Sequence, residues 1–193
     1  ETIVVAKDEG DFSSLSDALD SIQDNSQYKR YVIEVRSGQY EELEQIIMKP
    51  YVAVVGVSDV NCILEFNVSG NESDSLDDYA CIVMASNSSI TNITVKNTTT
   101  DNNTYMIGIY GDSIDNATLE GVQIEISGLT TNQYGIYYVS SEVNFNGLDI
   151  VSVSSDDQEN TNSVYVKNSE GCMEHLNIQM TGESNGSNTG IYI

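Results

Sequence analysis

The sequence predicts an all-β fold, a parallel β-helix (solenoid) with a short N-terminal capping helix, built as a single domain over residues 1–193. Three observations predict it. A pattern recurs every 27 to 28 residues in the second half of the chain, the apolar residues fall in short runs divided by Ser, Thr, Asn, Asp and Gly, and the chain holds one proline. Short apolar runs favour strands over helices, and a fixed repeat period is typical of stacked supersecondary units.

The repeat has two parts in each copy. The first part is Gly-Ile-Tyr or a variant of it, with an earlier and weaker copy at Ala80-Cys81-Ile82. The second part places apolar residues at its first, fourth and sixth positions. The copies of the first part are Gly108-Ile109-Tyr110, Gly135-Ile136-Tyr137, Ser163-Val164-Tyr165 and Gly190-Ile191-Tyr192, and those of the second span 90–95, 119–124, 145–150 and 173–178. Each copy therefore predicts one coil, with residues 67–193 forming the regular coils.

The third position of the second part predicts a corner, because an extra residue there interrupts the alternation of a strand. Asn92, Gly121, Gly147 and His175 hold this position. Asn and Gly tolerate the left-handed backbone conformation that a sharp corner needs. His175 is the only histidine of the chain, and we expect a turn residue there rather than a catalytic base.

Polar stretches return the chain from one coil to the next. Because the coils are in register, these stretches should form a ridge along one edge, which would be either a binding face or a solvated return path. They span 97–104, 127–133, 154–162 and 181–188, with 67–78 as a fifth.

The first 66 residues predict a cap and the first coils. Leu15, Ala18, Leu19 and Ile22 have the spacing of an amphipathic helix, which Asp11 or Ser13 could cap. A helix here would cover the open end of the solenoid core. Strands are expected at 2–5, 31–35, 45–47, 51–55 and 62–66, with turns at Ser37-Gly38 and Lys49-Pro50.

This first part resembles the amino-terminal portion of pectin methylesterases. The resemblance rests on the segments 3–8 (Ile-Val-Val-Ala-Lys-Asp), 10–15 (Gly-Asp-Phe-Ser-Ser-Leu), 17–19 (Asp-Ala-Leu), 31–33 (Tyr-Val-Ile) and 38–42 (Gly-Gln-Tyr-Glu-Glu). It implies a right-handed β-helix with an N-terminal helical cap. The coils after residue 66 resemble those of pectate-lyase-like proteins, phage tail spikes and microbial surface adhesins.

The esterase chemistry of that family has no counterpart here. Its catalytic aspartates lie in Gln-Asp-Thr and Asp-Phe-Ile-Phe-Gly motifs and its arginine in Gly-Arg-Pro-Trp; the chain contains none of these motifs and no tryptophan. What the two share is the scaffold, and a scaffold does not establish function.

The charge balance restricts the classes of partner that the chain can bind. Seven basic and 30 acidic residues give a net charge of −23, which would repel a phosphate backbone and an anionic membrane surface. We therefore expect no nucleic-acid partner, and the absence of a long apolar run predicts no membrane insertion. No cofactor is expected, although the carboxylates could bind calcium.

Cys62, Cys81 and Cys172 are far apart and lack the spacing of a zinc or redox site. All three lie in strand-like stretches, so we expect buried free thiols that act as small hydrophobes, with one disulfide as the alternative.

The candidate binding residues are Tyr110, Tyr137, Tyr165 and Tyr192, each of which follows an inward Ile or Val. They should point outward and stack into a ladder roughly 5 Å apart, suited to sugar rings. The alternative is that the rings only stiffen the sheet. Candidate N-glycosylation sites, each the Asn of an Asn-x-Ser/Thr sequence, are Asn67, Asn71, Asn87, Asn92, Asn97, Asn102, Asn116 and Asn185.

These features predict a non-catalytic β-helix on a cell surface or virion, or in the extracellular space, that contacts a polysaccharide, a surface glycan or another surface protein. Two alternatives stay open. One is a carbohydrate-active enzyme that uses acidic residues such as Asp112, Asp115, Asp149, Asp156 and Asp157; the other is a purely structural spacer or fibre module. The core is uncapped at Ile193, so we expect either a continuation of the chain or a homo-oligomer to cover it.

Overall fold

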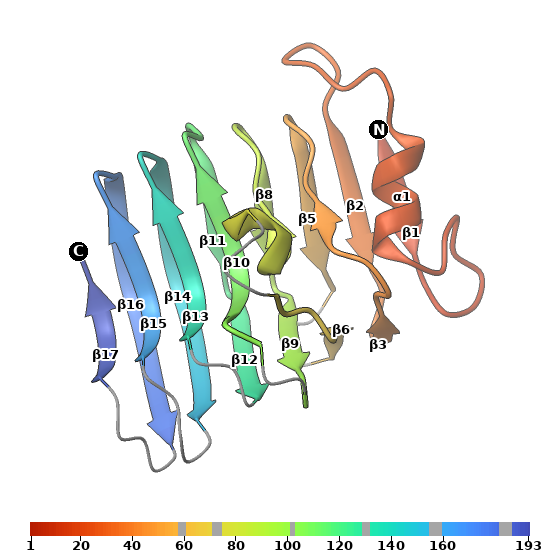
Figure 1. Cartoon of the computed structure of the whole chain (residues 1–193). Helices are drawn as coiled ribbons and strands as arrows, with labels where there is room; N and C mark the ends of the chain where they lie inside the picture. Colours follow the sequence, from red (N-terminus) through yellow and green to blue (C-terminus); the bar gives the residue numbers. More distant parts are fainter. Residues whose placement is uncertain (58–60, 71–74, 101–102, 129–131, 155–159, 182–186) are drawn as a thin grey trace.

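The chain forms a right-handed parallel β-helix capped by a helix at its N-terminal end (Figure 1). The repeat predicts the coils, the first 66 residues predict the cap, and the family resemblance implies the right hand. The computed structural model describes residues 1–57, 61–70, 75–100, 103–128, 132–154, 160–181 and 187–193. Every pair of neighbouring strands within the coils is parallel. The strands lie side by side along the axis, with the N-terminus at one end and the C-terminus near the other.

Each coil contributes strands to three faces. The first face holds β1 (Thr2–Val5), β2 (Tyr31–Val35), β5 (Val52–Gly56), β8 (Ser89–Thr91) and β11 (Ala117–Glu120). The second holds β3 (Gly38–Glu41), β6 (Cys62–Phe66), β9 (Thr94–Thr98) and β12 (Gln123–Gly128). The long strands β14 (Glu142–Ser154) and β16 (Glu170–Thr181) bend across both faces, which joins them into one 11-stranded sheet.

The third face is a separate six-stranded sheet. It consists of β4 (Ile46–Ile47), β7 (Ala80–Val83), β10 (Tyr105–Asp112), β13 (Asn132–Val139), β15 (Asn160–Lys167) and β17 (Ser187–Tyr192), in that spatial order. The Gly-Ile-Tyr copies all lie on this sheet.

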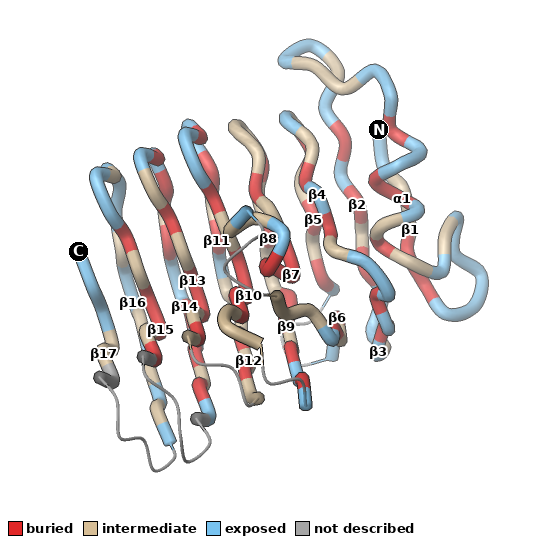
Figure 2. Tube along the Cα trace, viewed as in Figure 1, coloured by how far each residue is buried: buried red, intermediate tan, exposed pale blue. Residues whose placement is uncertain are grey.

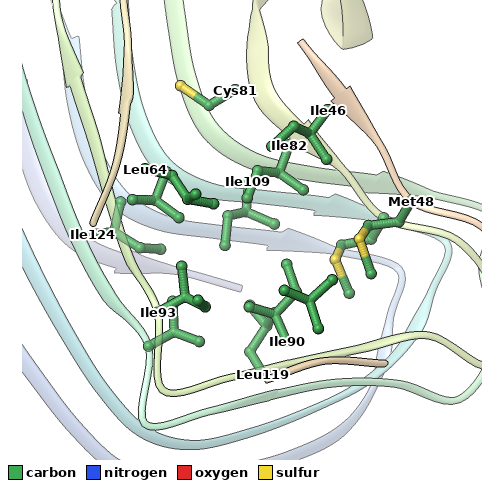
Figure 3. Close-up of a cluster of buried hydrophobic side chains, with 14 of the residues drawn as sticks. Ile46, Met48, Leu64, Cys81, Ile82, Ile90, Ile93, Ile109, Leu119 and Ile124 are labelled. Atoms are coloured by element: carbon green, nitrogen blue, oxygen red, sulfur yellow. The ribbon is translucent and has the colours of Figure 1, made fainter. Parts of the chain in front are cut away.

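The core runs inside the three faces, as Figures 2 and 3 show. Ile82 and Ile109 from the third face approach Leu64 and Ile124 from the second and Leu119 from the first. The predicted inward column Ile109, Ile136 and Val164 is fully buried, whereas Ile191 is 45% exposed because β17 is the last strand of its sheet.

The predicted corner is confirmed at all four positions. Asn92, Gly121, Gly147 and His175 have φ angles of 54°, 59°, 65° and 52°, which is the left-handed region. His175 therefore serves as a turn residue, and its Nδ1 lies 3.1 Å from Asn146 Oδ1.

The capping helix α1 (Leu15–Ser21) buries Leu15, Ala18 and Leu19. The predicted caps, Asp11 or Ser13, were both wrong, since Ser14 is the N-cap and its Oγ accepts a hydrogen bond from Asp17 N (3.3 Å). Buried Glu42 completes the cap, because Oε1 accepts from Leu15 N at 2.8 Å. A carboxylate is favourable at this end of a helix.

The turn predicted at Ser37-Gly38 is present as a bend at Ser37 between β2 and β3, with β3 beginning at Gly38. One element differs from the sequence prediction. Residues 67–78 were expected to be a polar return, yet Leu76–Tyr79 form a 3₁₀ helix, η1, whose Tyr79 is buried.

The cysteine prediction was correct for two residues and wrong for one. All three are free thiols; Cys62 and Cys81 are buried and Cys172 is exposed. Cys172 pairs in register with Asn144, on the outward-facing alternate position of its strand, which is why it does not enter the core.

Candidate functional site: the tyrosine ladder

The four predicted tyrosines form one column on the outside of the six-stranded sheet. Tyr110, Tyr137, Tyr165 and Tyr192 are register partners on β10, β13, β15 and β17. Successive ring centroids lie 5.8, 4.5 and 4.8 Å apart. The predicted stack is therefore present, and we call these four residues the tyrosine ladder.

The rings of the ladder lie nearly parallel to one another. Their interplanar angles are 18°, 13° and 2° along the column. Because each inner ring covers the faces of its neighbours, a ligand approaching the ladder meets ring edges and hydroxyl groups rather than ring faces. Tyr192, at the end of the column and 49% exposed, keeps one face free of the other ladder rings.

Further tyrosines extend the aromatic surface, and the repeat did not predict them. The ring of Tyr134 contacts Tyr137 and Tyr165 edge-on, at centroid distances of 5.0 and 5.8 Å. Tyr79 of η1 stacks on Tyr105 at 5.5 Å. The register partners of Tyr134 are Ile107 and Asn162, so no repeated residue type marks this column.

The segment around η1 covers the N-terminal end of the aromatic surface. Gly70 N donates to Tyr105 O (3.0 Å), and Tyr79, Ala80 and Ile107 form a small buried cluster outside the sheet. Asn97 is hydrogen-bonded to the start of this segment through both atoms of its amide. Its Oδ1 accepts from Val68 N at 3.0 Å and its Nδ2 donates to Val68 O at 2.8 Å. The exposed part of the ladder thus begins at Tyr110.

The phenol groups of Tyr110, Tyr134 and Tyr137 are hard to ionise. Burial raises the pKa of Tyr110 to about 12, and the nearby carboxylates of Asp112 and Asp77 add to the shift. Burial likewise raises the pKa of Tyr134 to about 12, and that of Tyr137 is raised by burial and its tyrosine neighbours. These hydroxyls therefore stay protonated at neutral pH and can both donate and accept hydrogen bonds.

Amide side chains border the aromatic surface. Asn162 is the register partner of Tyr134, and Asn132, two residues before Tyr134 on β13, is the register partner of Tyr105 and donates its Nδ2 to Thr104 O at 3.2 Å. Hydroxyl and amide groups side by side on a flat sheet are chemically suited to the hydroxyl groups of a sugar chain.

The described acidic residues of the enzyme alternative lie on two faces of the solenoid. Asp115 follows the end of β10 and lines a hollow with Glu142 and Glu170. Asp112 ends β10 on the third face, whereas Asp149 lies on β14 on the second face and accepts a hydrogen bond from Asn177 Nδ2 at 2.7 Å. Lys96 pairs with Glu65 at 3.3 Å. Asp156 and Asp157 lie outside the described residues. Across the described ranges no three His, Cys, Asp or Glu side chains are grouped to hold a metal ion.

A separate hollow of ≈ 450 Å³ lies beside α1, lined by Asp17, Asp20, Glu41, Glu42 and Glu44 among others. The carboxylate of Glu42 is engaged in capping the helix. No sequence pattern marks this hollow, because the cap helix and the loop after β3 form it together.

The predicted glycosylation sites differ in how far the structure exposes them. Asn67 and Asn116 are exposed, Asn87 and Asn92 are half-buried, and Asn97 is fully buried. Asn97 is thus no acceptor in the folded chain, because its amide is bonded to Val68. Asn71, Asn102 and Asn185 lie outside the described residues.

Comparisons with known proteins identify the scaffold. No family model and no curated protein matches the sequence. Among solved structures, the chain is similar to a pectin methylesterase in complex with a hexasaccharide (TM-score 0.55, 14% identity, 89% of this chain and 66% of that one). It is also similar to the pectin methylesterases PemA from Erwinia chrysanthemi (TM-score 0.54, 14% identity, 88% and 66%) and from Aspergillus niger (0.54, 16%, 97% and 85%).

The chain spans about two thirds of the length of the first two of these proteins. At these identities the likeness establishes the right-handed β-helix and nothing further about chemistry. No helix among the described residues is long and apolar enough to cross a membrane.

Proposed function

We propose that this chain is a non-catalytic β-helix of a cell surface or virion, exposed to the extracellular space, and that it binds a polysaccharide or surface glycan through the tyrosine ladder. The observation that carries the proposal is the ladder itself, a column of four outward tyrosines bordered by Tyr134 and by asparagine side chains. Contact with a glycan would use the ring edges and the protonated hydroxyls. The hexasaccharide bound to one structural neighbour supports glycan contact on this scaffold.

The proposal of a non-catalytic role rests on the separation of the carboxylates. Hydrolysis of a glycosidic bond needs two carboxyl groups about 5 to 10 Å apart, one on each side of the bond. Of the described candidates, Asp149 lies on the second face, whereas Asp112 and Asp115 lie at and just after the end of β10. The hollow that Asp115 lines does not include Asp112. We also propose that carboxylates on the acidic surface can bind calcium.

A glycan array tests the proposal with variants that keep the stack. Tyr137→Phe and Tyr165→Phe remove one hydroxyl each and leave the ring contacts in place. Because these two hydroxyls hydrogen-bond each other, we expect each variant to weaken binding severalfold and to lower the free energy of unfolding by no more than about 1 kcal/mol. Tyr28→Phe is the matched control, because Tyr28 is 91% exposed and outside the ladder. Binding that is equal in wild type and both ladder variants would refute the ladder as the site.

A structural spacer is the second candidate, favoured by the ring faces being covered by one another. In that case no glycan on the array binds, and Tyr137→Ala lowers the free energy of unfolding by the value of a lost aromatic stack, about 1 kcal/mol beyond the area lost. A hydrolysis readout on the same glycans tests the remaining alternative, a carbohydrate-active enzyme.

A further inference from the structure

The charges around the tyrosine ladder indicate which class of glycan it accepts, and this inference rests on the proposed glycan-binding function. The ladder offers hydroxyl groups that stay neutral at physiological pH and ring edges stacked about 5 Å apart. Neither forms an ion pair with a carboxylate or a sulfate, although a phenol hydroxyl can donate a hydrogen bond to one, as Tyr31 does to Asp24 at 2.6 Å. An acidic sugar would therefore lose hydration at the ladder without gaining an ion pair.

Few charged side chains flank the ladder. On the described strands of the six-stranded sheet, Asp112 and Lys167 are the carboxylate and the ammonium group. Both are register partners of Val139, so they lie in one row beside the ladder, two coils or about 10 Å apart. An acidic polysaccharide carries a charge on every sugar, whereas these strands offer it one ammonium group.

Negative charge prevails where the ladder begins. Asp77 and Asp78 belong to η1, which packs over the outside of β7 and β10, and Asp112 is two residues after Tyr110 on the same side of the strand. Asp112 and Asp77 are both close enough to disfavour an ionised Tyr110. The same field acts on an anionic ligand, and the net charge of −23 adds a long-range repulsion.

We propose that the ladder selects uncharged glycans and rejects polymers of uronic, sialic or sulfated sugars. Two like-charge contacts at about 5 Å in water amount to roughly a tenfold loss of affinity. We expect this loss at 20 mM salt and a reduction to less than about threefold in 1 M NaCl, where the screening length is ~3 Å.

The test has two stages. The first is a glycan array that holds neutral, amino-bearing, carboxylated and sulfated chains, probed with wild type and with Tyr137→Phe. The second compares the best-bound neutral glycan with the same glycan after oxidation of its primary hydroxyls to carboxylates, at low and high salt. We expect about tenfold weaker binding of the oxidised form, a larger difference for Lys167→Glu and a smaller one for Asp112→Asn. Asp20→Asn, on the exposed side of α1, is the control for a change of charge away from the ladder.

The outcomes separate the two proposals. An array without hits, or hits that Tyr137→Phe leaves unchanged, refutes the glycan site and the selectivity with it. Hits that depend on Tyr137 but are mainly acidic, or an oxidised glycan that binds as tightly as the neutral one, overturn the selectivity alone.

Discussion

Replacement of a corner glycine by alanine should destabilise the solenoid by an amount that the local geometry sets. Gly147 has φ = +65°, and a Cβ added there would meet Gly121 N at 3.6 Å, which is ordinary contact. The cost of Gly147→Ala is therefore the conformational one, about 1 to 2 kcal/mol for an L side chain in the left-handed region. Gly121 has φ = +59°, and its added Cβ would lie within contact range of the side-chain oxygen of Asn92. Because that side chain must also shift, we expect Gly121→Ala to cost about 2 to 3 kcal/mol.

Urea unfolding of the three proteins measures these differences, and the melting temperature should fall by about 2 to 4 °C per kcal/mol for a chain of this size. Gly190→Ala is the matched control. Gly190 has no positive φ, and its added Cβ would be 4.0 Å from Ile178, so its stability should be unchanged or slightly raised. A Gly147→Ala protein as stable as wild type would refute the left-handed corner.

Three further changes test other parts of the structure. Tyr138→Phe should raise the free energy of unfolding by about 1 to 3 kcal/mol, because the buried Tyr138 hydroxyl has no hydrogen-bond partner among the described residues. A clear loss of stability in urea would instead mean that this hydroxyl makes a hydrogen bond. Asn97→Ala should lower stability by about 2 to 3 kcal/mol through its two bonds to Val68, whereas Asn67→Gln, at an exposed position without a positive φ, should stay within about 0.5 kcal/mol. Equal effects of the two changes would contradict the assigned burial. In an alkaline titration followed by tyrosine absorbance, Tyr110 and Tyr134 should ionise near pH 12. Because their pKa is raised in the folded state, their contribution to stability is full below about pH 10 and is lost as the pH rises through 12. Complete ionisation of the native protein by pH 11 would contradict this prediction.

The sequence predicted the regular coils well because each structural requirement recurs at a fixed spacing. Asn92, Gly121, Gly147 and His175 share a backbone conformation, and the ladder tyrosines share an outward position, so four copies reinforce each inference. Strand bounds at Thr2–Val5, Tyr31–Val35 and Cys62–Phe66 agree with the prediction because each segment is a short, largely apolar run.

The features that the sequence did not predict occur once. Tyr134 aligns with an isoleucine and an asparagine, and Tyr79 reaches the aromatic surface only because η1 folds back over β10. Asn97 looks like any other polar residue of a return loop until the structure shows both of its amide atoms on Val68. Cys172 was predictable in principle, since the register of β14 and β16 places it on the outward alternate.

The central claim is that the hydroxyl edge of the tyrosine ladder contacts a glycan. Calorimetric titration of the best-bound glycan into wild type and into the double variant Tyr137→Phe, Tyr165→Phe tests it most directly. The loss of two hydrogen bonds should weaken the affinity about tenfold, while the free energy of unfolding falls by no more than about 1 kcal/mol. Equal affinity in the two proteins would contradict the claim.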